Sequence, residues 1–172
     1  LTNELLTLAR SDKNTIVLNL EVCNISDLVS EIIEPFKEIF EINNREFEYN
    51  SYECYSKVDR DKIKQIIYIL LDNAIKYTNE EDKVIIYVYI NSNDVCIEVV
   101  DTGFGMSDEA IKHVFERFYR EDKARSRETG GTGLGLSIAS TLVNLHKGTI
   151  RAEHNNPKGS RFIITLPRVK KI

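Results

Sequence analysis

Six of the chain's eight glycines fall in two clusters, and both clusters could bring backbone close to a ligand. The first cluster holds Gly103 and Gly105, and the second lies within residues 129–136, TGGTGLGL. Glycine-rich backbone has no Cβ atoms to obstruct such an approach. A helix-like run follows the second cluster, and the first turn of a helix presents unpaired N–H groups at the positive end of its dipole. This order indicates a site for an anion, most often a phosphate, with a flexible linker as the alternative.

A carboxylate and three polar side chains could complete such a site. Asp101 opens the first glycine cluster at the end of an apolar strand, where it could accept a hydrogen bond from an amine such as that of adenine. The alternative is a plain Asx turn. Asn73, Lys76 and Tyr77 share one face of a helix because they follow one another at helical spacing. Their amide oxygen, ammonium and ring suit magnesium, phosphate and a base, respectively, and an ordinary polar helix end is the alternative.

The composition of the 172-residue chain favours one soluble domain rather than a nucleic-acid-binding or membrane-spanning one. Its net charge is −4, and no apolar run approaches the roughly 18 residues of a membrane span. The opening LTNELLTLAR lacks the basic start and long apolar core of a signal peptide. Cys23, Cys54 and Cys96 are odd in number and form no CxxC pair, which favours reduced, buried thiols in a cytosolic setting.

The elements that must position these residues follow from hydrophobic periodicity and helix-capping residues. We expect helices over the first ten residues, from Ser26 or Asp27 to about 40, from Asp59 to about 78, near 108–115 and over 134–147. Strands are expected over 16–22, weakly over 47–58, and in two hairpins, 84–100 and 149–167, with a charged, mobile loop over 116–132. This order predicts a two-layer α+β sandwich, in which a mixed, mostly antiparallel sheet carries three main helices on one face.

Four segments in this order resemble the conserved boxes of one protein family. DNAIKYT (72–78), DTGFGM (101–106), FERFYR (115–120) and GGTGLGL (130–136) are similar to the N, G1, F and G2 boxes of the ATP-binding domain of bacterial sensor histidine kinases. The resemblance covers about residues 16–167 and implies a Bergerat-type ATP-binding fold. The F box separates histidine kinases from the gyrase, heat-shock-chaperone and mismatch-repair ATPases of the same superfamily. Neither a Walker-type P-loop nor an HRD catalytic loop occurs in the chain.

The resemblance also implies roles for individual residues. Asp101 would bind the adenine amine, Asn73 would hold Mg²⁺, and Tyr77 would meet the base. Lys76 would meet the phosphates, and Arg120 would reach the terminal phosphates as the catalytic residue. Ser160 would support Asp101 through water, and Phe115 and Phe118 would anchor in the core a lid over about 119–132. The remaining ATP-binding positions implied by the boxes are Gly103, Gly105, Met106, Gly131, Thr132, Gly133, Leu134, Gly135 and Leu136.

A kinase of this type implies partners that the chain itself does not supply. Residues 1–14 resemble the end of a dimerisation and phosphoacceptor helix, and residues 15–172 the catalytic ATP-binding domain. The domain would donate the γ-phosphoryl group to a histidine on that dimerisation domain, and a response regulator would follow. His113, His146 and His154 lack the acceptor context of an H-E-x-x-TP-like segment. The parent would be a homodimer with this domain at the cytoplasmic end of a membrane-anchored sensor, and the fragment a monomer that binds no nucleic acid.

Three other interpretations remain open at this stage. The domain could be an ATP-binding partner of the anti-sigma-factor-kinase type, although the F box and the helix-like start argue against that. It could also be a degenerate kinase, because Ile69 stands one helical turn before Asn73, where the resemblance implies a second asparagine or an acid in many kinases of the family. Gln65 is expected to lie too far from the site, and Asp72 to point elsewhere. The triplet Asp101-Thr102-Gly103 also spells the DTG of aspartic proteases, but a protease site needs two such carboxylates. A structural interaction domain would bind no nucleotide at all.

Overall fold

A seven-stranded sheet packed against helices forms the molecule in the computed structural model, which describes residues 2–12, 14–121 and 130–171. The strands are β1 (Glu21–Asn24), β2 (Glu46–Ser51), β3 (Tyr55–Val58), β4 (Lys83–Asn91), β5 (Asp94–Asp101), β6 (Thr149–His154) and β7 (Ser160–Val169). The helices are α1 (Thr2–Asp12), α2 (Ile25–Ile42), α3 (Arg60–Lys76), α4 (Asp108–His113) and α6 (Gly135–Leu145).

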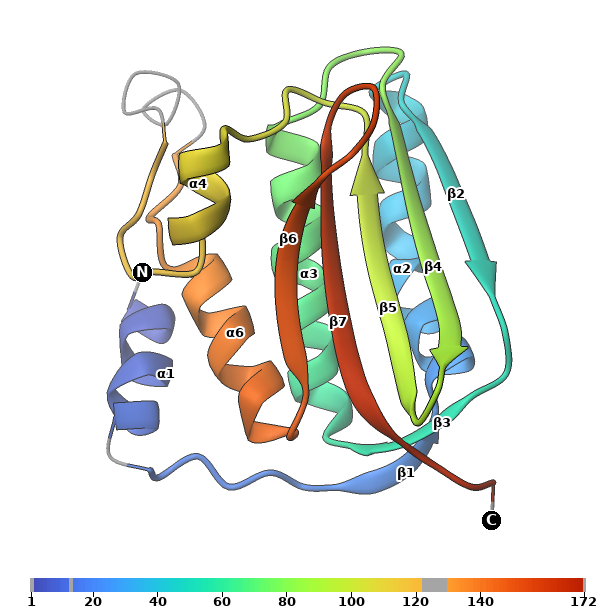
Figure 1. Ribbon diagram of the computed structural model, residues 1–172, viewed down its shortest axis with the longest axis vertical. Helices are drawn as coiled ribbons and strands as arrows, with labels where there is room; N and C mark the ends of the chain where they lie inside the picture. The colour runs from blue at the N-terminus through green and yellow to red at the C-terminus, as the bar shows by residue number, and fades with distance from the viewer. Residues whose placement is uncertain (1, 13, 122–129, 172) are drawn as a thin grey trace.

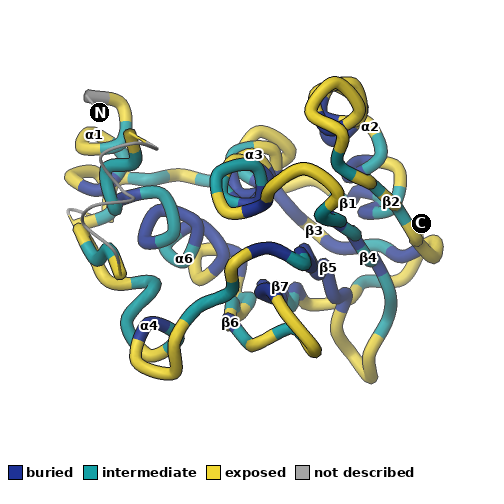
Figure 2. The backbone as a smooth tube through the Cα atoms, turned by 90° about the horizontal axis from the view of Figure 1, so that it is seen from above, coloured by how far each residue is buried: buried dark blue, intermediate teal, exposed yellow. Residues whose placement is uncertain are grey.

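The sheet has the mixed, mostly antiparallel pairing that the sequence predicts. Its order is β1-β3-β7-β5-β4-β2, with β6 also paired to β7 (Figure 1). β2 runs parallel to β4, and every other pair is antiparallel. Figure 2 shows α2, α3 and α6 on one side of β4, β5 and β7, with buried segments between the layers. The predicted two-layer α+β sandwich with three main helices on one face is confirmed.

The register of the central strands decides where the ends of β5 and β7 point. Ile97 pairs with Val88 on β4 and with Ile164 on β7, and all three side chains are buried under the helices. Successive side chains of a strand alternate between faces, so residues separated by two or four positions share a face. Asp101 follows Ile97 by four residues, and Ser160 precedes Ile164 by four. Asp101 therefore lies on the helix-facing side at the end of β5, and Ser160 lies on that side at the start of β7.

The long helices α2 and α3 begin at capping side chains and bury apolar residues against the sheet. The Asn24 side chain caps α2 by accepting a hydrogen bond from the Ser26 N–H, at 3.1 Å. Asp59 caps α3, as predicted, through the Lys62 N–H at 3.2 Å. The α3 side chains Ile63, Ile66, Ile67, Leu70, Leu71 and Ala74 are buried. A fully packed helix of this kind fixes the direction of the polar residues at its C-terminal end.

Some expected elements differ from the structure. The strand expected over 16–22 is wrong for most of that range, because β1 begins only at Glu21 and Val17 is 88% exposed. α2 begins one residue before the predicted caps, since Asn24 rather than Ser26 or Asp27 occupies the capping position. Cys23, Cys54 and Cys96 are free and buried, as predicted. No helix among the described residues is both long and apolar enough to cross a membrane.

Candidate functional site

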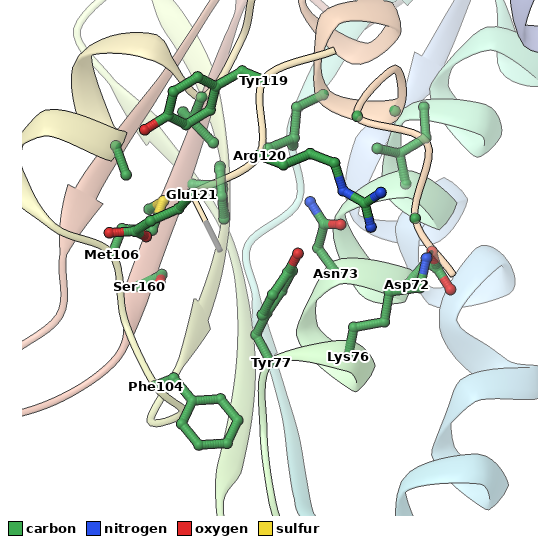
Figure 3. Close-up of a pocket in the computed structure, with 18 of the residues that line it drawn as sticks. Asp72, Asn73, Lys76, Tyr77, Phe104, Met106, Tyr119, Arg120, Glu121 and Ser160 are labelled. Carbon is green, nitrogen blue, oxygen red and sulfur yellow. Dashed lines mark ion pairs between the residues drawn. The ribbon is translucent and has the colours of Figure 1, made fainter. Parts of the chain in front are cut away.

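A cavity of about 740 Å³ opens where the end of β5 meets α3, α4 and the start of α6. Figure 3 shows Asn73 and Tyr77, at the end of α3, pointing toward Arg120, while Lys76 extends toward Asp72. Met106, Ser160 and Glu121 lie on the other side of the cavity. The sequence-predicted site residues that line it are Asn73, Lys76, Tyr77, Asp101, Gly105, Met106, Arg120, Gly131, Thr132, Gly133, Gly135, Leu136 and Ser160. Segments that are distant along the chain thus meet at one site.

Two predicted site residues, Gly103 and Leu134, lie outside the cavity lining and act behind it. The Gly103 N–H donates to Asp101 Oδ1 at 2.9 Å. A Cβ atom on Gly103 would lie 2.0 Å from the Tyr77 carbonyl oxygen, so only glycine allows the turn to pack against the end of α3. Leu134 is fully buried in the core immediately before α6. These residues hold the walls of the site in place.

Asp101 is the buried acid at the closed end of the cavity. Asp101 is only 5% exposed. Burial raises the pKa of its carboxyl group to about 6, because the carboxylate loses hydration. The backbone N–H groups of Gly103 and Ser160 lower the pKa in part, since both donate to Oδ1, at 2.9 and 3.3 Å. Within the described residues both of these bonds fall on Oδ1, so Oδ2 is the oxygen available to a ligand. Ser160 contributes its N–H here, whereas the resemblance implied its hydroxyl.

The open end of the cavity brings two cations, Lys76 and Arg120, to the glycine loop. A Cβ atom on Gly131 would lie 3.6 Å from Arg120 Nη2 and 4.0 Å from Lys76 Nζ, so the glycine loop, the arginine and the lysine converge. Lys76 Nζ also pairs with Asp72 Oδ2 at 2.7 Å. Asp72 lines the cavity, and the expectation that it points elsewhere is therefore wrong. The spacing of Asp72 and Lys76, four residues apart on a helix, is the sequence signal that could have found this pair.

Sequence reasoning also missed two carboxylates that contact the loops around the cavity. Glu4 of α1 lines the cavity and accepts a hydrogen bond from the Thr132 hydroxyl at 2.9 Å. Glu121 Oε1 accepts the Ser107 N–H at 2.9 Å, which ties the residue after Arg120 to the start of α4. Neither contact joins residues at helical or hairpin spacing, so the sequence carries no signal for them.

The two phenylalanines expected to anchor the lid have different environments. Phe115 is partly buried and meets the Phe162 ring edge-on at 6.3 Å between centroids. Phe118 is 63% exposed, so its predicted burial is wrong. Its backbone has φ of 62°, and its N–H donates to the Gly133 carbonyl at 2.9 Å. This backbone bond, rather than a buried ring, connects Phe118 to the glycine loop. Residues 122–129, the centre of the predicted mobile loop, lie outside the described residues.

The three histidines sit in ordinary structural settings. His113 contacts Glu116 at 2.6 Å and Glu109 at 3.0 Å, and His154 contacts Asp108 at 2.6 Å. His146 is buried, and its Nε2 accepts the Asp59 N–H at 3.1 Å. None of the three lines the cavity.

Ile69 lines the cavity one turn before Asn73, as its helical position predicts. Its Cγ2 atom would lie 3.3 Å from a Cβ placed on Gly135, the first residue of α6. Ile69 therefore packs an apolar side chain against the start of α6. The polar residues Asp72 and Asn73 line the same cavity. Gln65 lies outside the lining of this cavity, as expected.

Comparison with known proteins places this site in a family. Residues 58–170 match the family described as "Histidine kinase-, DNA gyrase B-, and HSP90-like ATPase". The sensor histidine kinase WalK of Bacillus subtilis is 38% identical over 171 residues, which cover 97% of this chain and 28% of WalK. Two other relatives, the sensor histidine kinase RppB of Synechocystis and the sensor protein CiaH of Streptococcus pneumoniae, are each matched over 37% of their own length. The chain therefore spans well under half the length of these relatives.

Solved structures agree with the sequence match. The Acinetobacter baumannii histidine kinase AdeS superimposes with a TM-score of 0.80 at 25% identity, over 99% of this chain and 78% of that one. The full-length ShkA structure, solved in complex with AMPPNP, gives 0.84 at 25% identity, over 98% of this chain and 35% of that one. The chain therefore belongs to the histidine kinase-, DNA gyrase B- and HSP90-like ATPases, as a domain of the histidine-kinase type.

Proposed function

We propose that the domain binds Mg·ATP in this cavity and donates the γ-phosphoryl group to a histidine on a dimerisation domain of its parent protein. The observation that carries the proposal is the polarity of the cavity. A buried carboxylate, Asp101, stands at the closed end, and two cations, Lys76 and Arg120, stand at the open end. An adenine nucleotide has the matching arrangement, with an amine at one end and a triphosphate at the other.

The closed end supports recognition of adenine. Asp101 Oδ1 is held by two backbone N–H groups, which leaves Oδ2 to accept the exocyclic amine. Met106 and Phe162 line the walls, and apolar and aromatic side chains of this kind pack against a base. A nucleobase with a carbonyl in place of the amine would leave two acceptors facing each other in a buried site. Such a mismatch is strongly disfavoured.

The open end supports binding of the phosphates and of magnesium. Lys76 and Arg120 supply positive charge, and Gly131, Thr132 and Gly133 supply backbone at the start of α6. The amide oxygen of Asn73 is a ligand of the type that Mg²⁺ prefers, and the neighbouring Asp72 carboxylate adds an oxygen to the same wall. These donors fit the metal, which when bound would neutralise charge on the phosphates. The chain's own contribution to transfer is to orient the phosphates between α3 and the glycine loop, with Arg120 against their charge.

The relatives support the remaining parts of the proposal. They are sensor histidine kinases and are several times longer than this chain, and ShkA was solved with AMPPNP. We infer that α1 is the end of the dimerisation helix, that residues 15–172 are the catalytic domain, and that the phosphoacceptor histidine lies on the rest of that helix pair. The parent would be a homodimeric, membrane-anchored sensor with this domain in the cytoplasm, and its phosphohistidine would supply a response regulator.

The decisive experiment compares ATP with GTP by calorimetric titration in the presence of Mg²⁺. Wild type should bind ATP, bind GTP much more weakly, and lose affinity when the metal is removed with a chelator. Asp101→Asn should weaken ATP binding at least about 100-fold, because the amide turns a charged acceptor into a weaker and partly mismatched one. The matched control is Asp94→Asn, which changes an exposed acid at the other end of β5 and should bind ATP as wild type does. Equal heats for ATP and GTP would exclude the adenine assignment.

The transfer step needs its own measurement. With γ-labelled ATP, the chain alone should acquire no acid-labile label, because His113, His146 and His154 lie outside the cavity. Adding the dimerisation helices of the parent should produce label on those helices. Label on any of the three histidines of this chain would contradict the proposal.

A further inference from the structure

The turn between β6 and β7 packs directly against the main chain of Asp101. Gly159 in this turn has φ of 106°, and a Cβ atom on it would lie 1.8 Å from the Asp101 carbonyl oxygen. The same turn reaches the first glycine cluster, since a Cβ on Gly105 would lie 3.2 Å from the Gly159 carbonyl oxygen. Residues some sixty positions apart are therefore in van der Waals contact along the floor of the cavity.

One side chain of this turn bonds the Asp101 backbone. The Asn155 amide Nδ2 donates to the carbonyl oxygen of Asp101 at 3.0 Å and to that of Lys158 at 3.1 Å. The backbone N–H of Asn155 donates to the Gly159 carbonyl oxygen at 3.0 Å. Asn155 thus joins three parts of the structure: the start of the turn, its far side, and the end of β5. Because β5 ends at Asp101, the β5–β7 ladder bonds stop there, and the amide continues the connection between the two strands.

The carboxylate of Asp101 depends on the same connection. Its Oδ1 accepts the N–H of Ser160, which follows directly after Gly159. The distance between Ser160 and Asp101 is set by how the turn sits on the end of β5. Lys158 also ties the turn to Asp82, at 3.5 Å, but Asn155 is the side chain of the turn that bonds Asp101 itself. A shift of the turn would lengthen a bond that is already 3.3 Å and would release the carboxylate to rotate.

We propose that Asn155 is a positioning residue for nucleobase recognition, whose amide holds the Asp101 main chain and the β6–β7 turn together so that Asp101 faces the adenine amine. Asn155 does not line the cavity, so it acts through Asp101. This role rests on the proposed ATP-binding function and adds a residue to it. This role predicts a specific result. Loss of the Asn155 amide should reduce the discrimination between nucleobases and should leave the binding of the phosphates unchanged.

The test compares ATP with ITP, which carries a carbonyl where ATP carries the amine. Competition titrations against a fluorescent ATP analogue give the affinity ratio for wild type, Asn155→Ala, Asn155→Asp and Asn155→Gln. The first two variants lack the donor, and their ATP-to-ITP ratio should fall about tenfold, the size expected for a lost bond that orients a charged group. Affinity for ITP should stay within about twofold. Asn155→Gln keeps the amide and should recover the larger part of the ratio.

The control is Asn93→Ala, in the β4–β5 turn at the opposite end of the same sheet, which should leave the ratio unchanged. A thermal unfolding scan accompanies each variant. If Asn155→Ala weakens ATP and ITP in equal proportion, or changes neither, the positioning role is overturned. If wild type binds neither nucleotide, the proposed function itself fails and this role fails with it. If wild type is selective and the Asn155 variants keep its full selectivity, the positioning role of Asn155 fails while the proposed function stands.

Discussion

The two ends of the cavity are built in different ways. At the closed end, Asp101 is buried and is held by bonds from Gly103, in the turn after β5, and from Ser160 and Asn155, at the β6–β7 turn. At the open end, Lys76 is paired with the half-exposed Asp72, and the nearby contact between Thr132 and Glu4 joins one side chain to another. The first arrangement is formed mainly by backbone groups, and the second mainly by charged side chains.

This difference separates specificity from phosphate handling. Backbone donors held by packed turns cannot rearrange without local unfolding, so under the proposed function the choice of base would be set when the protein folds. Side-chain ion pairs near the surface contribute little energy and exchange partners readily. Under the same proposal, the phosphate end could adjust its contacts during binding and transfer. Substitutions at the closed end should be costly and specific for the base, and those at the open end should be mild and indifferent to it.

The largest expected effect concerns two glycines, one at each end. Gly159→Ala places a Cβ atom 1.8 Å from the Asp101 carbonyl oxygen at a φ of 106°. We expect it to lower the free energy of unfolding by about 3 kcal/mol or more, through both steric overlap and backbone strain. Gly130→Ala, at a φ of 67°, meets no described atom within 4 Å and should cost only about 1 kcal/mol. Urea denaturation followed by circular dichroism measures both, and equal losses would remove the contrast between the two ends.

Much of this site could be predicted from the sequence, and the reason lies in local geometry. Helical spacing alone placed Asn73, Lys76 and Tyr77 on one face, and the structure brings all three to the cavity. The strand and glycine pattern placed Asp101 at a strand end. The contact between Asp101 and Ser160 depends on the β5–β7 register, so only the family resemblance suggested it.

The failures have physical reasons as well. The apolar alternation over 16–20 indicated a strand, but this segment finds no neighbouring strand, and Val17 remains exposed. The family resemblance implied that Phe118 anchors a lid in the core, yet its side chain is 63% exposed and its backbone has a positive φ of 62°. The contact of Glu4 with Thr132 depends on how α1 packs against the glycine loop, and that of Asn155 with Asp101 on how the β6–β7 turn packs against the end of β5. Packing of this kind leaves no periodic signal in the sequence.

The second prediction tests the composition of the open end. Ile69→Asn places a polar side chain on the cavity wall that also holds Asn73, where under the proposed function it would act on a water of the bound metal. Outer partners of a metal typically change affinity about 10–100-fold, so we expect Mg·ATP to bind roughly tenfold more tightly, with a larger dependence on magnesium. Calorimetry with and without the metal checks this, with Ile69→Val as the apolar control. Unfolding of the Asn variant would show that packing against Gly135 is the role of Ile69, and unchanged binding would show that no metal partner is missing.

The third prediction follows from the raised pKa of Asp101, about 6. The carboxylate is the form that accepts the adenine amine, so ATP affinity should be constant above pH 7 and fall as the pH drops through 6. At pH 5 about nine in ten of these groups are protonated, which predicts roughly tenfold weaker binding. The ATP-to-ITP ratio measures the effect, because the phosphates of both nucleotides also take up protons near this pH and their contribution cancels.

Folding stability should change in the opposite direction over the same pH range. A carboxyl group with a pKa raised in the folded state favours folding most when protonated, so its contribution is present below about pH 4 and is lost as the pH rises through 6. Asp101→Asn should flatten this part of the stability profile. An ATP-to-ITP ratio that does not change between pH 5 and 8 would contradict the assignment of Asp101 as the amine acceptor.

The smallest expected effect belongs to Glu4, which places a negative charge beside the loop that would receive the triphosphate. Glu4→Gln keeps an oxygen to accept the Thr132 hydroxyl but removes the charge, so ATP should bind about threefold more tightly. The gain is small because Glu4 is only partly buried and its field is screened by water and salt. This gain should shrink further when the salt concentration rises from 50 to about 500 mM.

Glu38→Gln, an exposed change on the distant helix α2, is the control. ITP should gain by the same factor as ATP, because the charge acts on the phosphates rather than on the base. A gain confined to ATP would mean that Glu4 reaches the closed end through α1 and the glycine loop, and that the two ends of the cavity are coupled.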